Sequence, residues 1–289
     1  MQGVCLPIVT PFYKGALDLD SYQSLVRHYV AKGVSALIPL GTTGEAPTIE
    51  EAEYIEIVEA TIAAAGGGVP IVPGISSNST HKAEKLLRNL ERYPVEGYLV
   101  TSPYYNLPSQ QGIYEHFLAL SRATAKKLFV YNIPYRTGRN IENDTILKIA
   151  QLPHISGIKD SCGSIAQSLE LLRRRPSGFF VLTGEDALFF VNLACGGDGG
   201  ILAAAHLNTE RFLKVLELSR SNDHHGALRE WEGFCGSIPL LFGEPNPGPV
   251  KYALFRKGLI RSEETRLPLA PISDTLKGRL DQLIESGAI

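Results

Sequence analysis

The feature that most constrains the fold is a regular alternation of short apolar runs with longer segments of helical periodicity. Eight apolar runs, each bounded by Gly, Pro or Thr, recur along the chain, and we expect each of them to form a strand. They cover residues 3–10, 35–41, 69–75, 97–102, 128–133, 155–159, 179–184 and 199–204. Helical patterns lie between them, over residues 21–32, 49–65, 80–93, 110–124, 143–151, 164–174 and 186–195.

Strands that are apolar on both faces and alternate with helices are typical of parallel sheets. Eight such units in 289 residues favour an α/β fold closed into a (β/α)8 TIM barrel over an open sheet. No Gly-x-Gly-x-x-Gly turn follows the first strand, which argues against a nucleotide-binding fold. We expect the barrel to occupy residues 1–220, and residues 221–289 to form a small C-terminal helical extension.

Composition narrows the class of ligand. The formal net charge is -2, so the chain has no basic field that would attract nucleic acid or an anionic membrane. No apolar run approaches the ~20 residues that span a bilayer, and the first residues lack the pattern of a signal peptide. The four cysteines and seven histidines show neither disulfide nor metal-ligand spacing. These patterns predict a cytoplasmic protein that binds small, neutral or weakly acidic molecules and no metal.

Polar groups gather at the predicted carboxyl ends of the strands, which is where (β/α)8 barrels carry their chemistry. The segments concerned are residues 41–45, 102–106, 131–136, 159–160 and 183–185. Together they would bring hydroxyls, phenols, one amine and one guanidinium to a single rim.

Lys159 is the only lysine at the end of an apolar strand. Burial in a barrel penalises the charged ammonium and favours the free amine, which can attack a carbonyl carbon to form a Schiff base. Two interpretations are open on the residues alone. Lys159 is either such a nucleophile or a structural lysine paired with Asp160 or Glu185.

Neighbouring strand ends supply partners for such an amine. Tyr131 can place a phenol near the Lys159 nitrogen and shuttle protons, although strand-end tyrosines are also common core residues. Thr42 and Thr43, framed by glycines, offer hydroxyls and N–H groups to a small carboxylate, or else begin a helix. Arg136 offers a planar fork to a second carboxylate, or forms a surface ion pair. Their convergence on one rim favours the functional interpretation.

Several motifs in a consistent order resemble one known family. They are Gly41-Thr42-Thr43-Gly44-Glu45, Ser102-Pro103-Tyr104-Tyr105-Asn106, Tyr131-Asn132-Ile133-Pro134, Gly157-Ile158-Lys159-Asp160 and Gly243-Glu244-Pro245-Asn246-Pro247. Along nearly its whole length the chain resembles the dihydrodipicolinate synthase and N-acetylneuraminate lyase family of pyruvate-dependent class I aldolases. The resemblance implies pyruvate and a small aldehyde as substrates. It also implies a covalent pyruvate imine on Lys159 and no other cofactor.

By this resemblance, Thr42 and Thr43 hold the pyruvate carboxylate. Tyr131, Thr42 and Tyr105 form a proton relay. Tyr105 would act in the site of a neighbouring subunit, which implies a homo-oligomer built as a dimer of dimers. The resemblance also gives two residues whose backbone lines the lysine pocket: Gly184 and Ile201.

Arg136 matches the arginine with which the synthase branch binds L-aspartate 4-semialdehyde, which implies formation of 4-hydroxy-tetrahydrodipicolinate in lysine biosynthesis. Tyr135 stands where many synthases carry a small residue. The alternatives are therefore an aldolase or hydratase-lyase acting on a 2-keto-3-deoxy acid, and a silent sensor that binds a keto acid without forming an imine. Asn78 and Tyr104 match a lysine effector site, but Lys82 replaces its usual glutamate, which argues against inhibition by lysine.

Overall fold

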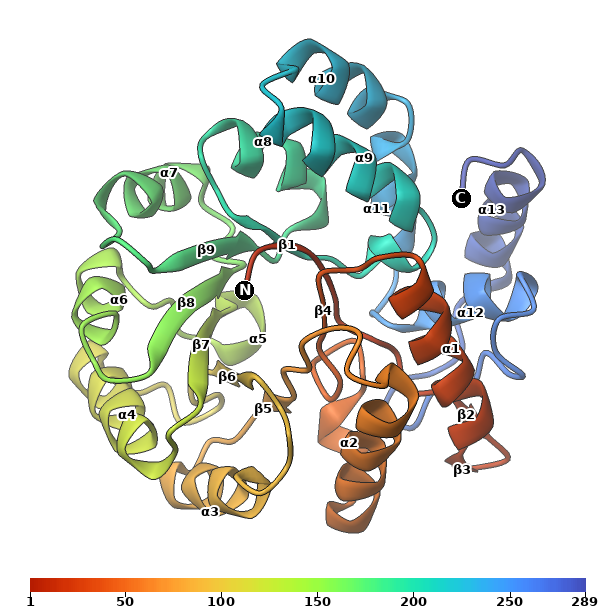
Figure 1. Cartoon of the computed structure of the whole chain (residues 1–289). Helices are drawn as coiled ribbons and strands as arrows, with labels where there is room; N and C mark the ends of the chain where they lie inside the picture. The colour runs from red at the N-terminus through yellow and green to blue at the C-terminus, as the bar shows by residue number, and fades with distance from the viewer.

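The computed structural model describes all 289 residues and contains one sheet of eight parallel strands (Figure 1). Around the sheet the strands follow the order β4-β1-β10-β9-β8-β7-β6-β5. Their bounds are β1 Gly3–Leu6, β4 Ala36–Leu37, β5 Gly74–Ile75, β6 Gly97–Thr101, β7 Lys127–Asn132, β8 Ile155–Asp160, β9 Phe180–Thr183 and β10 Gly199–Ile201. Each of them lies within one residue of a predicted apolar run or inside it.

The sheet closes into a barrel between β4 and β5. Leu37 pairs with Ile71 as an isolated parallel bridge, and the Val72 N–H donates to the Leu37 carbonyl at 2.9 Å. The Gly74 N–H donates to the Pro39 carbonyl at 2.9 Å. Two prolines in this stretch lack an N–H, which explains why the strand predicted over residues 69–75 is regular only at its end. The predicted barrel of eight parallel strands is confirmed.

Helices surround the strands, and they begin and end where local chemistry dictates. The barrel helices are α1 Leu19–Ala31, α2 Glu51–Ala65, α3 Thr80–Leu90, α4 Gln110–Ala123, α6 Asn143–Ile149, α7 Ile165–Arg174, α8 Phe189–Ala194 and α9 Thr209–Arg220. Asp18, Ser79, Ser109 and Ser164 each accept a backbone N–H in the first turn of α1, α3, α4 and α7. The segment predicted as a helix over residues 186–195 begins instead as a 3-10 turn, η2 Asp186–Leu188, before α8.

Three kinds of short element were not predicted from the sequence. β2 Phe12–Tyr13 and β3 Ala16–Leu17 form an antiparallel hairpin between β1 and α1. The helical turn α5 Pro134–Thr137 follows β7 directly. The further 3-10 turns are η1 Ala46–Thr48, η3 Ala204–His206 and η4 Cys235–Ser237. Elements of two to four residues are too short to show a period in the sequence.

Four helices follow α9: α10 His224–Glu232, α11 Ile238–Leu241, α12 Gly248–Arg256 and α13 Asp274–Glu285. Figure 1 shows α10 beyond α8 and α9, whereas α12 and α13 lie beside α1 on the side of the barrel where β4 and β1 are found. None of the helices in the chain combines the length and the apolar character required to cross a membrane.

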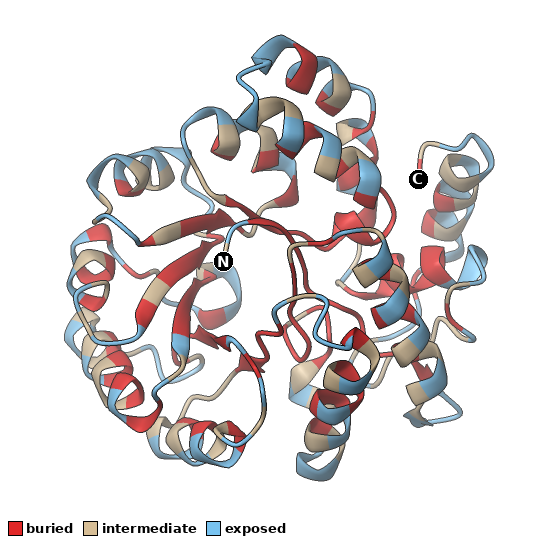
Figure 2. Ribbon diagram, in the orientation of Figure 1, coloured by how far each residue is buried: buried red, intermediate tan, exposed pale blue.

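The core consists of two separate apolar clusters. One lies inside the barrel and contains Cys5, Ala36, Ile38, Val72, Leu99, Phe129, Tyr131, Ile133, Leu182 and Ile201. The other contains 60 buried residues and fills the space between the strands and the surrounding helices. Figure 2 accordingly shows the strands as buried and the outer faces of the helices as exposed. Because the inside of the barrel is packed with side chains, only its rim is open to a ligand.

Candidate active site

Two neighbouring strands place Tyr131 beside Lys159. β7 and β8 pair in parallel, and in their register Tyr131 is the direct partner of Lys159. Both side chains are buried, with 4% and 6% of their surface exposed. The Lys159 Nζ lies 4.2 Å from the centroid of the Tyr131 ring. A parallel ladder therefore fixes the amine against the phenol ring without help from any loop.

Lys159 has no carboxylate partner, although it is buried. It takes part in none of the salt bridges of the chain. Asp160 accepts hydrogen bonds from the Cys162 N–H at 3.1 Å and from the Ser168 hydroxyl at 2.5 Å instead. The interpretation of Lys159 as a structural ion-pair lysine, with Asp160 or Glu185 as its partner, is therefore wrong.

Gly184 gives the Lys159 side chain its space. A Cβ atom at this position would lie 2.1 Å from the Ser161 Oγ and 2.6 Å from the Lys159 Cε. Both distances are far below ordinary van der Waals contact, so any larger residue would displace the lysine or the serine. Glycine is required at position 184 because the Ser161 and Lys159 side chains approach its backbone closely, and not because the backbone has an unusual conformation.

The loop between β4 and η1 carries Thr42 and Thr43. Thr43 is buried, with 3% of its surface exposed, and its Oγ1 accepts a hydrogen bond from the Asn246 Nδ2 at 3.0 Å. The same loop ends at Glu45, whose carboxylate forms a buried ion pair with Lys251 of α12 at 2.7 Å. One contact to α12 and one to the segment that precedes it thus hold this loop over the barrel.

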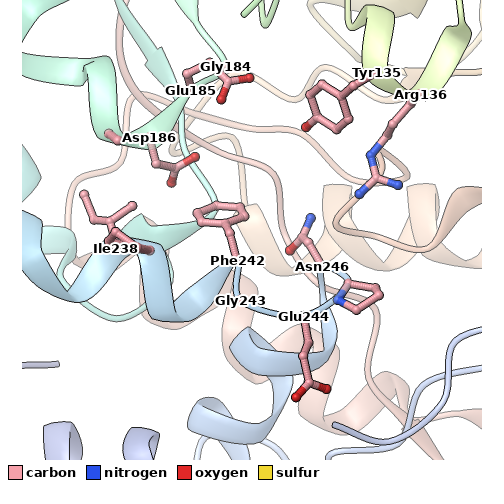
Figure 3. Close-up of a pocket in the computed structure, with 13 residues that line it drawn as sticks. Tyr135, Arg136, Gly184, Glu185, Asp186, Ile238, Phe242, Gly243, Glu244 and Asn246 are labelled. Atoms are coloured by element: carbon pink, nitrogen blue, oxygen red, sulfur yellow. The ribbon is translucent and has the colours of Figure 1, made fainter. Parts of the chain in front are cut away.

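A cavity of about 40 Å³ brings most of the predicted site residues together. Its lining contains Thr42, Thr43, Tyr131, Arg136, Lys159, Gly184 and Ile201. It adjoins a cavity of about 640 Å³ because Tyr135, Arg136, Gly184, Asp186, Phe242 and Asn246 line both (Figure 3). A third cavity, of about 220 Å³, shares Thr42 and Arg136 with the small one. The amine therefore faces an inner chamber that widens outward past Arg136.

Tyr105 is the one predicted site residue that lies outside these cavities. It is 88% exposed and adopts a positive φ of 70°, a conformation that costs free energy for a residue with a side chain. Within a single chain its side chain is therefore exposed to solvent and lines none of the cavities around Lys159.

The structure adds residues to the site that the sequence analysis gave no role. Asp186, Phe242 and Asn246 line both the inner chamber and the outer cavity. Burial raises the pKa of Asp186 to about 7, opposed by the Ala204 N–H and by the charge of Lys159. Asp186 could have been noticed at the end of the seventh strand. Asn246 lies in the Gly243-Glu244-Pro245-Asn246-Pro247 motif but was given no role, and Phe242, directly before that motif, had no signal in the sequence.

The comparisons with known proteins agree along the whole chain. The model of the dihydrodipicolinate synthetase family matches residues 1–286. This chain belongs to the dihydrodipicolinate synthetase family. It is 50% identical over 284 residues to a 4-hydroxy-tetrahydrodipicolinate synthase of Clostridium acetobutylicum, a match that covers 98% of this chain and 99% of the relative. It is 39% identical over 299 residues to the synthase of Thermotoga maritima, covering 100% and 99% of the two chains.

Solved structures of the family share the fold throughout. The dihydrodipicolinate synthase of Thermotoga maritima superposes with a TM-score of 0.96 at 37% identity, covering 100% of this chain and 99% of the other. The synthase of Acinetobacter baumannii, solved in complex with pyruvate, gives a TM-score of 0.96 at 33% identity, with coverage of 100% and 99%. The TIM-barrel fold predicted from the sequence is the fold of this family. The chain is accordingly an enzyme of the lyase type.

Proposed function

We propose that this enzyme condenses pyruvate with L-aspartate 4-semialdehyde to 4-hydroxy-tetrahydrodipicolinate, a reaction of lysine biosynthesis. The observation that carries the proposal is the unpaired, buried Lys159 amine held against Tyr131 in a chamber that Thr42 and Thr43 also line. The relatives from Clostridium acetobutylicum and Thermotoga maritima are both named 4-hydroxy-tetrahydrodipicolinate synthase. These features also support it over a silent sensor, which would have no use for an unpaired buried amine.

The first step is formation of an imine. The Lys159 nitrogen attacks the carbonyl carbon of pyruvate, and the carbonyl oxygen leaves as water after proton transfer through the Tyr131 phenol and the Thr42 hydroxyl. The hydroxyl and backbone N–H groups of Thr42 and Thr43 hold the pyruvate carboxylate. The backbone of Gly184 and of Ile201 lines the pocket of the lysine chain.

The second step joins the two substrates. The positive imine nitrogen withdraws electrons, so the pyruvate methyl group loses a proton and becomes an enamine. Its carbon attacks the aldehyde carbon of the second substrate, whose oxygen takes a proton and becomes a hydroxyl. Arg136 binds the carboxylate of that substrate at the point where the inner chamber meets the outer cavity. Attack of the substrate amine on the imine carbon then closes the ring and releases Lys159.

The proposal includes an oligomer. Tyr105 is 88% exposed and held in a strained conformation, which suits a phenol that completes the relay in the site of a neighbouring subunit. We propose a homo-oligomer assembled as a dimer of dimers, in which each Tyr105 serves its partner's Lys159. The chemistry needs no cofactor beyond the covalent pyruvate imine.

The test is reduction with borohydride in the presence of pyruvate, followed by peptide mass analysis, beside a coupled assay with L-aspartate 4-semialdehyde. We expect the adduct on Lys159 and consumption of the semialdehyde. An adduct on Lys159 without consumption of the semialdehyde would favour the alternative function, an aldolase or hydratase-lyase that acts on a 2-keto-3-deoxy acid. If no adduct forms on any residue, the Schiff-base mechanism is wrong.

A further inference from the structure

We propose that Asn246 is a positioning residue for pyruvate: its amide orients the Thr43 hydroxyl so that this hydroxyl donates a hydrogen bond to the pyruvate carboxylate. The inference rests on the proposed function and deepens it. It needs only the first step of that function, in which pyruvate binds at Lys159. Asn246 acts on the keto acid through Thr43 and not by direct contact.

The Thr43 hydroxyl has a proton that no atom of the chain accepts. Thr43 is 3% exposed and lines the inner chamber. Its Oγ1 takes part in one hydrogen bond, in which it accepts from the Asn246 Nδ2 at 3.0 Å. A hydroxyl can donate one hydrogen bond as well as accept. Because buried donors are normally satisfied, the free proton of this hydroxyl points to a ligand in the chamber.

The amide of Asn246 controls the direction of that proton. An NH2 group donates and does not accept, so the Thr43 proton has to point away from it. Without the amide the hydroxyl would be free to rotate, and pyruvate would have to order it on binding. Ordering a group at the moment of binding weakens affinity. The amide therefore prepares the hydroxyl for an anion before pyruvate enters the chamber.

Asn246 differs from an asparagine that only joins two segments. Asn132 is of that kind: its Nδ2 donates to the Asn140 Oδ1 at 2.9 Å, and its Oδ1 accepts from the Ile141 N–H at 3.1 Å. Both ends of the Asn132 amide are thus satisfied within the chain. The Asn246 Oδ1 is buried and has no partner, so only the end that contacts Thr43 is used. A buried acceptor left without a donor costs free energy, which is typical of a site residue.

Both partners of this hydrogen bond are held by further contacts. The ion pair between Glu45 and α12, at 2.7 Å, holds the loop that carries Thr43. The segment that carries Asn246 is held at Glu244, whose carboxylate accepts from the Ser273 N–H at 3.0 and 3.2 Å. Figure 3 shows the Asn246 side chain pointing from this segment into the cavity. The amide and the hydroxyl therefore meet as two fixed groups.

Two competing explanations make different predictions. If Asn246 only ties the loop to the C-terminal segment, its loss should lower the melting temperature and disturb all kinetic constants together. If it contacts the aldehyde, since it also lines the outer cavity, its loss should raise the KM of the aldehyde. Only the proposed role makes the effect of Asn246 on pyruvate depend on the Thr43 hydroxyl.

The experiment is a double-mutant cycle with Asn246→Leu and Thr43→Val. Leucine has nearly the shape of asparagine, and valine that of threonine, so each substitution removes hydrogen bonds with little change in volume. The measured quantity is the pyruvate concentration that half-saturates borohydride trapping on Lys159 in the absence of an aldehyde. A melting curve and the KM of L-aspartate 4-semialdehyde are recorded for each variant.

Two further variants complete the design. Asn208→Leu is the matched control, because Asn208 is 8% exposed, donates to the Ala288 carbonyl at 3.2 Å and lines none of the three cavities around Lys159. Asn246→Asp keeps the shape and polarity of the side chain and serves if the leucine variant does not fold. It places an acceptor where the donor stands, so it should capture the Thr43 proton and weaken pyruvate binding more than leucine does.

We expect Asn246→Leu to raise the half-saturating pyruvate concentration by about three- to tenfold, and Thr43→Val to raise it by about tenfold or more. In the Thr43→Val background, Asn246→Leu should change this concentration by less than about twofold, because the hydroxyl through which it acts is already absent. Asn208→Leu should leave the concentration at the wild-type level. Saturating pyruvate should still convert Lys159 fully into the adduct in each variant.

The inference is overturned if Asn246→Leu or Asn246→Asp binds pyruvate as tightly as the wild type. An effect that persists undiminished in the Thr43→Val background, that is confined to the KM of the aldehyde, or that Asn208→Leu shares overturns it equally. These outcomes leave the proposed function intact, because the wild type still forms its adduct. A wild type that forms no adduct on Lys159 would instead mean that the proposed function is wrong.

Discussion

Two lysines of this chain are buried against an aromatic ring, yet they have opposite surroundings. Lys251 on α12 is fully buried, and its Nζ lies 4.3 Å from the centroid of the Phe12 ring. It pairs with the buried Glu45 at 2.7 Å. Lys159 lies 4.2 Å from the Tyr131 ring centroid, but it has no carboxylate partner and faces a cavity instead.

The difference shows that burial alone does not mark a catalytic lysine. Burial lowers the pKa of Lys251, and the charge and hydrogen bond of Glu45 oppose that shift. The Lys251 amine is held by its carboxylate partner and lines none of the three cavities around Lys159. Lys159 differs in having no such partner and in meeting open space where a keto acid can enter. The unpaired amine beside a cavity is the combination that indicates a nucleophile.

Lys159→Met should separate activity from stability most strongly. Methionine keeps the length of the chain and removes the amine, so pyruvate trapping and turnover should both be lost completely. Because Lys159 has no ion-pair partner, the free energy of unfolding should fall by no more than ~1 kcal/mol, or rise. Denaturant unfolding followed beside the borohydride assay checks both parts. A loss of stability of several kcal/mol would mean that Lys159 has a structural role comparable to that of Lys251.

Tyr131→Phe gives Lys159 the same kind of ring that Lys251 has. The ring should still pack against the lysine, while the phenolic proton donor is gone. We expect turnover to fall by about 10²- to 10⁴-fold, the usual contribution of a positioned acid or base, with stability nearly unchanged. Steady-state kinetics and a melting curve test this together. Turnover close to that of the wild type would exclude Tyr131 from the proton relay.

Lys251→Met should have the opposite profile to Lys159→Met. It leaves the Glu45 carboxylate buried without its cation, which should lower the free energy of unfolding by ~3–5 kcal/mol. Below its melting temperature, the variant should still trap pyruvate on Lys159. Adding Glu45→Gln should restore part of the lost stability, since the second substitution removes the uncompensated charge. If trapping disappears in a variant that is shown to be folded, the two lysines are not independent.

Sequence patterns could predict the barrel because each strand is short, apolar and bounded by turn residues. They could also place Lys159 and Tyr131 on one rim, since parallel strands bring their carboxyl ends together. They could not predict the burial of Lys251, because a lysine in a helix normally points to solvent. Its partner Glu45 is 206 positions away in the chain, so only the packing of α12 on the loop of Thr42 and Thr43 brings them together. The contact of Asn246 with Thr43, 203 positions away, could not be predicted for the same reason, although Asn246 belongs to a motif noted in the sequence.

Phe12→Leu tests the interaction for which we expect the smallest effect, that of the Phe12 ring with the ammonium group of Lys251. The Phe12 ring lies 4.3 Å from both the Lys251 Nζ and the Arg266 guanidinium carbon, so it contacts two cations at once. Leucine keeps an apolar side chain but removes the negative face of the ring. Phe129→Leu makes the same change at an equally buried ring that takes part in none of the cation–π contacts of the chain. We expect Phe12→Leu to cost ~1–2 kcal/mol more than its control in the free energy of unfolding, measured by denaturant titration. Equal losses would show that the ring acts only by packing, and that Glu45 alone holds the Lys251 ammonium.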